Sequence, residues 1–372
     1  MSKKEEALAE LAMTKMLTNV DLSNINLAGF DLSDCAFSDV NFSNTDLSNS
    51  NMTSCQFMNC NFSGANMTGV TALSAQFLKP NFKDAEFIDL DLRAAQIFDS
   101  EIDNARLKSE MLTFCCVHAV VFNTIKLEGT LQSFIANESR FKNMDMRNGK
   151  VNRATFNQCS FEESDLSETY LEEVTLIDTD LSGVALNDVE INKGLFQKID
   201  LSNRNFEGVT FFAVQLIGCE LTNINFANAS LEKCGFMKAQ LDGSDFSNVN
   251  ALQANFLEAT LKNARFEGAD IRQTIWTDAN LEGADFTDCN LESSNFENAF
   301  LKKSKLRNAK IGFGNFAGAD LTDAQLVNCD LYMAILDRII DDNTDWSQSN
   351  KRRAQRPDHD KNEAEEWPTA RR

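Results

Sequence analysis

Ala254-Asn-Phe-Leu-Glu, Ala259-Thr-Leu-Lys-Asn, Ala264-Arg-Phe-Glu-Gly and Ala269-Asp-Ile-Arg-Gln follow one another without a gap. Every fifth residue of this stretch is apolar, and we call these apolar residues centres. Two positions before each centre the side chain is small, and the remaining three positions are mostly polar. A period of five fits neither an α-helix, with about 3.6 residues per turn, nor a flat strand, with a period of about 2. It predicts a coil that turns a corner every five residues, with the centre and the small residue pointing inward.

The pattern extends over most of the chain. Its centres can be followed in one phase from Leu22 to Leu127 and in a second phase from Leu131 to Leu336. The spacing between Leu127 and Leu131 is one residue short, and the register then resumes. The two phases hold about 64 units, so the repeat is the fold itself and not a decoration on another fold.

An Asp or Asn often stands directly before the centre, as in Asp31-Leu32, Asn41-Phe42, Asp285-Phe286 and Asp320-Leu321. Together with the small residue this pattern resembles the pentapeptide repeat family, whose unit is written A(D/N)LXX. The resemblance implies an all-β fold, a right-handed quadrilateral parallel β-helix of about 16 coils with short helical caps. At about 4.8 Å per coil, such an array would be about 75 to 80 Å long.

The chain is expected to have three segments. Residues 1–19 are expected to form an N-terminal capping helix that covers the first coil, because an open coil end exposes unpaired backbone. Residues 20–338 are expected to form the β-helix, with a register slip near 128–140. At the slip we expect a kink or widened corner, which could be a functional hinge or a tolerated deletion. Residues 339–372 are expected to hold the end of the C-terminal cap and a disordered tail.

The apolar residues near the end of the array predict a short helix over 332–340 that closes the last coil. The candidate residues of this cap are Met333, Ile335, Leu336, Ile339 and Ile340. In relatives that the chain resembles, a C-terminal helix makes the dimer contact. The resemblance therefore implies a homodimer through the C-terminal end.

The ten cysteines could suggest a disulfide or metal framework. Nine fall at the small inward position, namely Cys35, Cys55, Cys60, Cys115, Cys159, Cys219, Cys234, Cys289 and Cys329. Cysteine packs there as a small apolar residue. This placement favours free buried thiols and a reducing compartment over disulfides or a metal site.

No catalytic, cofactor or metal site is predicted. Cys115 is expected to face inward and His118 outward, so the two side chains do not meet as a nucleophile and its base. The glycine-rich residues 312–318 keep the five-residue register, so the repeat explains them better than a phosphate-binding loop does. We therefore expect neither enzyme activity nor a cofactor.

The formal net charge is −21, with a pI of about 4.5. This acidity disfavours direct binding to nucleic acid or to anionic membranes. The chain shows no apolar run of about 18 residues and no signal-peptide pattern. The expected location is the bacterial cytoplasm, and the alternative is secretion into a host cell.

The residue after each centre should point to solvent, and on one side of the coil many of these residues are apolar. The candidate protein-interaction face consists of Met58, Leu78, Phe98, Ile177, Phe212, Ile217, Met237, Leu252 and Leu257. Apolar side chains aligned one coil apart are typical of an interface. Tolerated surface apolar residues are an equally good interpretation.

These observations favour a non-enzymatic interaction scaffold, an acidic rod that binds a protein partner. Some members of the family that the chain resembles protect DNA gyrase by imitating the charge and width of duplex DNA. The resemblance thus implies mimicry toward a topoisomerase or another DNA-binding protein as one form of this function. The alternative is a secreted bacterial effector that acts on host proteins.

Overall fold

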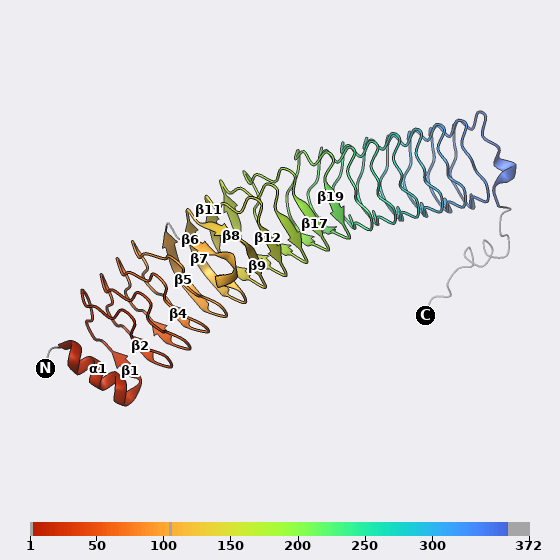
Figure 1. Ribbon diagram of the computed structural model, residues 1–372. Coiled ribbons are helices and arrows are strands. Elements are labelled where there is room, and N and C mark those ends of the chain that lie inside the picture. Colours follow the sequence, from red (N-terminus) through yellow and green to blue (C-terminus); the bar gives the residue numbers. More distant parts are fainter. Residues whose placement is uncertain (1–2, 104–105, 356–372) are drawn as a thin grey trace, which may run out of the picture. The chain divides into compact units, whose positions relative to one another are not determined.

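A computed structural model describes residues 3–103 and 106–355 of the chain (Figure 1). Its contacts divide the chain into two compact units, Met1–Val189 and Glu190–Arg372. Each unit is a parallel β-solenoid, as the five-residue period predicts. The register slip lies inside the first unit.

The first unit begins with helix α1 (Lys3–Thr14) and continues as short strands. These strands are β1 (Met16–Thr18), β2 (Ala36–Ser38), β3 (Gln56–Met58), β4 (Gln76–Leu78), β5 (Gln96–Asp103), β6 (Arg106–Lys108), β7 (Cys116–Asn123), β8 (Lys126–Glu128), β9 (Thr130–Gln132), β10 (Ile135–Asn137), β11 (Arg140–Lys142), β12 (Lys150–Asn152), β13 (Thr155–Asn157), β14 (Ser160–Glu162), β15 (Tyr170–Glu172) and β16 (Thr175–Ile177). A 3-10 helix, η1 (Ser109–Leu112), precedes β7.

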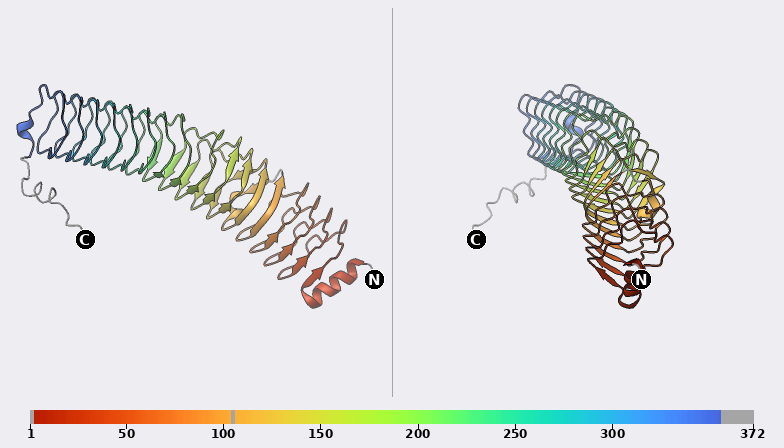
Figure 2. Two further views of the ribbon diagram at one scale, coloured as in Figure 1. Left: turned by 180° about the vertical axis from the view of Figure 1, so that it is seen from behind. Right: turned by 90° about the vertical axis from the view of Figure 1, so that its left-hand side faces the viewer.

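One side of the first unit is a continuous parallel sheet. Its strands pair in the order β1, β2, β3, β4, β5, β7, β10, β13 and β16, and Figure 2 shows them stacked along one side of the coils. Paired residues are one coil apart, so that Phe57 pairs with Phe77 and Phe77 with Ile97. Further pairs are β9 with β12, β12 with β15, β6 with β8, and β11 with β7 and β14.

The second unit repeats this plan with fewer strands. It contains β17 (Glu190–Asn192), β18 (Leu195–Gln197), β19 (Thr210–Phe212), β20 (Gln215–Ile217) and the 3-10 helix η2 (Lys351–Arg353). β17 pairs with β19 and β18 with β20, and single parallel bridges continue the stacking as far as the bridge between Gln325 and Asp345.

Local chemistry explains why the chain turns after each centre. The side chain of the Asp or Asn before the centre accepts a hydrogen bond from the backbone two residues on, as Asp285 Oδ1 does from Thr287 N at 3.1 Å. This local bond closes a turn that competes with helix. The residue two after the centre takes a positive φ, which is 55° at Asn263 and 70° at Gly268. Glycine and asparagine tolerate that conformation best.

Aromatic centres stack one coil apart in the core, as their twenty-residue period predicts. In the second unit the rings of Phe236 and Phe256 are 4.8 Å apart, and those of Phe256 and Trp276 are 4.1 Å apart and parallel. In the first unit Phe57 and Phe77 stack at 4.8 Å. These side chains are buried, so the aromatic residues build the core and do not form a ligand site.

The register slip is a deletion of one residue, and the strands of the sheet pair without a break on both sides of it. Strands before it pair with a shift of twenty residues, whereas β7 pairs with β10 through Val117 and Ala136, which are nineteen residues apart. Phe134 and Ala136 are both buried beyond the slip. Phe134 occupies the inward position that is usually small, and Ala136 occupies the centre that is usually large. The pair exchanges the two sizes, so the core volume is kept.

Helix α1 covers the first coil but is shorter than expected. It ends at Thr14, and Leu17 lies in strand β1. Ala7 and Leu11 of the helix are buried, whereas the side chain of Met13 is 87% exposed. The cap is therefore a short helix followed directly by a strand of the solenoid.

The helix predicted over 332–340 is wrong. Met333, Ile335, Leu336, Ile339 and Ile340 continue the five-residue coil, with bridges from Asn315 to Ile335 and from Asp320 to Ile340. Met333 has a φ of 56°, which a helix cannot hold. The chain stays in register to Gln355, whose backbone N–H donates to the carbonyl of Ala334 at 2.9 Å. The rest of the tail predicted to be disordered, residues 356–372, lies outside the described residues.

Candidate functional site

Along one column of centres on the continuous sheet of the first unit, the flanking outward side chains carry no full charge. They occupy the positions before and after the centres Leu17, Phe37, Phe57, Phe77, Ile97, Val117, Ala136, Phe156 and Leu176, and we call this surface the uncharged face. Its residues are Met16, Thr18, Ala36, Ser38, Gln56, Met58, Gln76, Leu78, Gln96, Phe98, Cys116, His118, Ile135, Asn137, Thr155, Asn157, Thr175 and Ile177. Glu101 and Asp103, which flank the second centre of β5, are charged and lie outside it. In a chain with a net charge of −21, such a surface is unexpected.

The predicted apolar residues lie side by side on this face. Met58 pairs with Leu78, and Leu78 with Phe98, each on the neighbouring strand. The side chains of Met58 and Leu78 are 48% and 40% exposed, and Phe98 is half-buried. Together with Met16 and their neighbours, Met58 and Leu78 line a shallow groove of about 280 Å³ over β1 to β4. Ile177 lies on the same face, on β16.

The face has a second column of stacked side chains, at the position before each centre. Reading only the residue after each centre does not show it. Gln56, Gln76 and Gln96 pair with one another on consecutive strands, one position before the centre. Strands β3, β4 and β5 therefore each show one amide and one apolar side chain to solvent. The signal was present in the sequence as glutamines twenty residues apart.

The second unit has a corresponding uncharged stretch. Ile217 follows the centre of β20, and Met237 and Leu257 follow the centres that lie one and two coils further on, all half-buried. The residues before these centres, Gln215, Gly235 and Asn255, are bridged to one another and are also uncharged.

Phe212 and Leu252 do not belong to this stretch. Phe212 ends β19, on the adjacent side of the coil, and the ammonium of Lys233 lies 5.2 Å from its ring centroid. Glu232 stands between Phe212 and Leu252 in the same column, one coil from each. The charge interrupts the apolar surface, so these two predicted residues form no continuous patch with each other.

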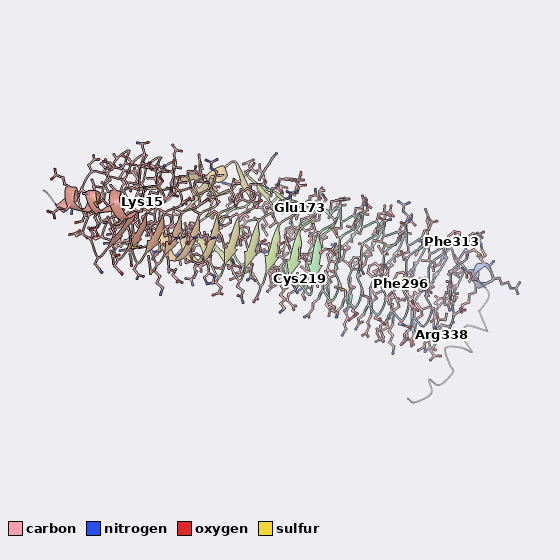
Figure 3. All side chains as sticks on the ribbon, turned by 90° about the horizontal axis from the view of Figure 1, so that it is seen from below. Lys15, Glu173, Cys219, Phe296, Phe313 and Arg338 are labelled. Atoms are coloured by element: carbon pink, nitrogen blue, oxygen red, sulfur yellow. The ribbon has the colours of Figure 1, made fainter. Side chains whose placement is uncertain are left out.

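The residues predicted for a C-terminal cap are only partly covered. Ile335, Leu336 and Ile339 are half-buried, while Met333 and Ile340 are exposed. At a nearby corner Phe313 packs edge-on against Tyr332 at 5.4 Å, and Arg353 lies over the Tyr332 ring. Figure 3 shows Phe313 near this end, whereas Phe296 lies within the stacked coils.

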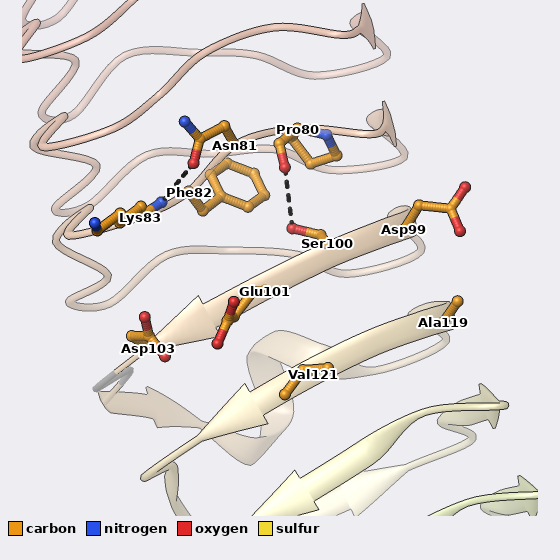
Figure 4. A pocket seen from close by; sticks show the side chains of 10 residues that line it. All are labelled: Pro80, Asn81, Phe82, Lys83, Asp99, Ser100, Glu101, Asp103, Ala119 and Val121. Carbon is orange, nitrogen blue, oxygen red and sulfur yellow. Dashed lines mark hydrogen bonds between the residues drawn. The ribbon is translucent and has the colours of Figure 1, made fainter.

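A hollow lies where β5 and β7 run straight through a corner (Figure 4). It has a volume of about 770 Å³ and is lined in part by Pro80, Lys83, Glu101 and Asp103. Both carboxylates accept hydrogen bonds from Asn123 Nδ2, at 2.7 and 2.6 Å. These carboxylates therefore support the straightened corner, and the buried Ser100 hydroxyl, which also lines the hollow, donates to the Pro80 carbonyl at 3.4 Å.

The cysteine side chains behave as core residues. All ten are free thiols, and the nine predicted to point inward are buried. Burial raises the pKa of Cys55, Cys234 and Cys289 to about 12. Among residues 3–103 and 106–355, no three His, Cys, Asp or Glu side chains gather closely enough to hold a metal ion. None of the helices in the same residues has the length and apolar content of a membrane-spanning segment.

Two sequence profiles match the chain. The profile described as a pentapeptide repeat region matches residues 149–226 and 219–296. The profile described as pentapeptide repeats in eight copies matches residues 17–53, 35–71, 55–95 and 304–340. Together these matches cover well over half of the chain. The comparison with curated proteins found no significant match.

Solved structures with a similar fold include pentapeptide repeat proteins. A pentapeptide repeat protein from the thylakoid lumen of Arabidopsis thaliana is 27% identical over 26% of this chain and 68% of its own, with a TM-score of 0.26. QnrB1, a plasmid-mediated fluoroquinolone resistance protein, is 19% identical over 47% and 90%, with a TM-score of 0.34. HetL of the cyanobacterium Nostoc, involved in heterocyst differentiation regulation, is 18% identical over 89% and 95%, with a TM-score of 0.21. At these values the likeness carries no argument about what this chain binds.

Proposed function

The chain belongs to the pentapeptide repeat family, and on that premise we propose that it is a non-enzymatic scaffold that binds a protein partner through the uncharged face. The observation that carries the proposal is the absence of full charge on the outward side chains that flank nine stacked centres in an acidic chain. Surface charge keeps acidic proteins apart from one another and from other acidic surfaces. A face that lacks it and shows aligned apolar side chains is suited to burial against another protein.

The composition of the face also supports binding to protein. Core residues of interfaces are depleted in charge and enriched in aromatic residues and methionine. Phe98 and Met58 supply such side chains, and the amides of Gln56, Gln76 and Gln96 can each donate and accept hydrogen bonds. A partner can therefore bury this face without leaving a charge unpaired.

Mimicry of DNA toward a topoisomerase or another DNA-binding protein is a second candidate, favoured by the acidity of the other sides of the coil. A net charge of −21 over 372 residues is about one charge per twenty-residue coil, or one per about 4.8 Å. Duplex DNA carries one charge per about 1.7 Å. Lysines on the coil offset several carboxylates, as Lys305 does for Asp285 at 2.9 Å. The lower charge density makes the uncharged face the stronger candidate.

A capture experiment tests the proposal. Tagged wild-type chain is compared with the double variant Met58→Glu/Phe98→Glu and with Ile88→Glu. Ile88 is 41% exposed and lies half a coil away, on the opposite side of the first unit. A partner that binds wild type and Ile88→Glu but not the double variant supports the proposal.

Equal capture by all three proteins would refute the assignment of the face. Repeating the capture at low and high salt separates the two candidates. Partners of an acidic DNA mimic are released by salt, whereas those of an uncharged apolar face are retained. A gyrase supercoiling assay, run with the wild-type chain, tests the topoisomerase directly.

A further inference from the structure

We propose that the uncharged face of the first unit also pairs with the same face of a second copy of this chain. The inference rests on the proposed function, because it takes this face to be an interaction surface. It adds the identity of one partner and the geometry of the contact.

Charge limits the ways in which two copies can meet. Each copy carries a net charge of −21, so most contacts between copies place like charges against one another. The uncharged face is an extended surface of the first unit where two copies can approach without burying or opposing a carboxylate. At its rim Lys79 and Asp99 follow Leu78 and Phe98, so the border of the face has charges of both signs.

The two columns of the face select one orientation of the second copy. Met58, Leu78 and Phe98 form the apolar column, and Gln56, Gln76 and Gln96 form the amide column beside it. A two-fold axis parallel to the strands places apolar column on apolar column and amide column on amide column. An axis along the stacking direction would place amides against apolar side chains, which costs their hydrogen bonds.

The favoured arrangement is centred on Leu78. Leu78 packs against Leu78 of the second copy, Met58 against Phe98 of the second copy, and the Gln76 amides face each other. A primary amide both donates and accepts, so two identical glutamines can bond across the axis. The contact is therefore self-complementary, as an isologous two-fold interface must be.

The size of the face sets the strength of the contact. Nine strands about 4.8 Å apart, each contributing three residues of about 3.3 Å, present a plane of about 430 Å² per copy. A two-fold axis at Leu78 on β4 overlaps only the seven strands from β1 to β10, about 335 Å² per copy, so the contact buries about 670 Å², below the roughly 1,200 Å² at which stable complexes begin. The dimer is accordingly weak, and its population depends on protein concentration.

Sedimentation velocity over a concentration series, at low and at high salt, tests the pairing. The dimer fraction is expected to rise with concentration and also with salt, because salt screens the repulsion between two acidic copies. Leu78→Glu is expected to abolish the dimer, since it places two carboxylates at the axis. Ile88→Glu adds the same charge at a position of nearly equal exposure, 41% against 40%, and is expected to leave the dimer intact.

Cross-linking tests the geometry. In a Cys116→Ser background, which removes the half-exposed thiol of the same face, Leu78→Cys is expected to cross-link to itself with a bis-maleimide, and Ile88→Cys is not. A chain that stays monomeric at high concentration and high salt would overturn the inference. So would a dimer that survives Leu78→Glu. Either result leaves the capture of another protein by the face to be judged by its own variants, Met58→Glu/Phe98→Glu, so the two proposals fail separately.

Discussion

The ring of Phe122 stacks on the ring of Phe141 at 5.1 Å with an interplanar angle of 4°, although the two residues are nineteen positions apart and not twenty. Phe141 in turn stacks on Phe161 at 4.9 Å with the normal shift of twenty. The missing residue therefore lies in a turn, and the aromatic column passes the deletion without a break. Alignment of the centres, and not the length of each connection, decides the register of the solenoid.

Restoring the missing residue should consequently have little effect on stability. A serine inserted after Gly129 gives Leu127 and Leu131 the five-residue spacing of the other units. The expected change in the free energy of unfolding is within about 1 kcal/mol. The measurement is thermal unfolding followed by circular dichroism.

The matched control is a serine inserted after Gly243, within a regular coil. That insertion separates Leu241 from Phe246 by six residues and forces a bulge or a shift of every later centre. Its expected cost is about 2 kcal/mol or more. Equal destabilisation by the two insertions would contradict the view that the slip is a tolerated deletion.

Most of the fold follows from the sequence because the same five-residue signal is written dozens of times. A unit that departs from the pattern, such as the one with the large Phe134 at the small position, does not change the assignment of the neighbouring units. The turn after each centre is also local, since the bond between Asp285 and Thr287 that closes it spans three residues. Local rules of this kind can be read without knowledge of distant contacts.

The end of the array could not be read in the same way. Apolar residues such as Ile335, Leu336 and Ile339 satisfy both a helix and a coil, and propensity alone does not separate the two. The structure shows that the next centre position holds Asp341, which accepts hydrogen bonds from Trp346 Nε1 at 3.2 Å and from Lys351 Nζ at 2.6 Å. These polar contacts end the apolar core without an α-helix, and Lys351 belongs to the short 3-10 helix η2.

Part of the uncharged face is visible in the sequence. The apolar column appeared as soon as the residues after the centres were read at a period of twenty. The lack of charge appears only when the residues before the centres are added, and strand pairing is needed to show that Gln76 and Leu78 share one surface. The straight passage of β5 through the corner at Ser100 had no sequence signal, because a serine at the small position is common elsewhere in the array.

Thr274 is expected to stabilise the core by accepting a hydrogen bond from a buried indole. The Trp276 Nε1–H donates to Thr274 Oγ1 at 2.6 Å, and the same hydroxyl lies 2.9 Å from Ser294 Oγ. Thr274→Val keeps the shape but leaves the indole N–H without its partner, which should cost about 1–3 kcal/mol. Denaturant unfolding followed by circular dichroism measures the loss.

A threonine on the surface provides the comparison. Thr322 donates to Asp320 Oδ1 at 2.6 Å in a half-buried turn, where water can replace the bond. Thr322→Val is expected to cost less than about 1 kcal/mol. If Thr274→Val were no worse than Thr322→Val, the indole would have to find another acceptor.

Acid should destabilise the solenoid through its turns. Hydrogen bonds from the side chain and backbone of Ser33 lower the pKa of Asp31, and those of Ser48 lower the pKa of Asp46. A carboxylate with a lowered folded-state pKa stabilises the fold above its unfolded pKa, which is near 3.9, and loses this contribution as the pH falls through the folded value. The melting temperature should therefore be flat from about pH 6 to 8 and fall below about pH 4.

The high net charge acts in the opposite direction. Protonation relieves repulsion among the carboxylates of a chain with charge −21, which would raise stability as the pH falls. At physiological salt this repulsion is screened beyond about 8 Å, whereas Asp46 Oδ1 holds Ser48 N at 3.1 Å. A melting temperature that rises steadily through pH 4 would show that repulsion, and not the turns, dominates.

Cys116 should be the one thiol that reacts in the folded protein. It is half-exposed on the uncharged face, whereas the other nine cysteines are buried. Desolvation raises the pKa of Cys60, Cys159 and Cys219 to about 11, so almost none of these thiols is ionised at neutral pH. Native labelling with a maleimide, read by intact mass, is expected to add one label, and labelling in denaturant is expected to add ten. Cys116→Ser should remove the native label. A second thiol that reacts at a similar rate would mean that a coil opens readily, because no buried cysteine can reach the reagent while the stacked core is closed.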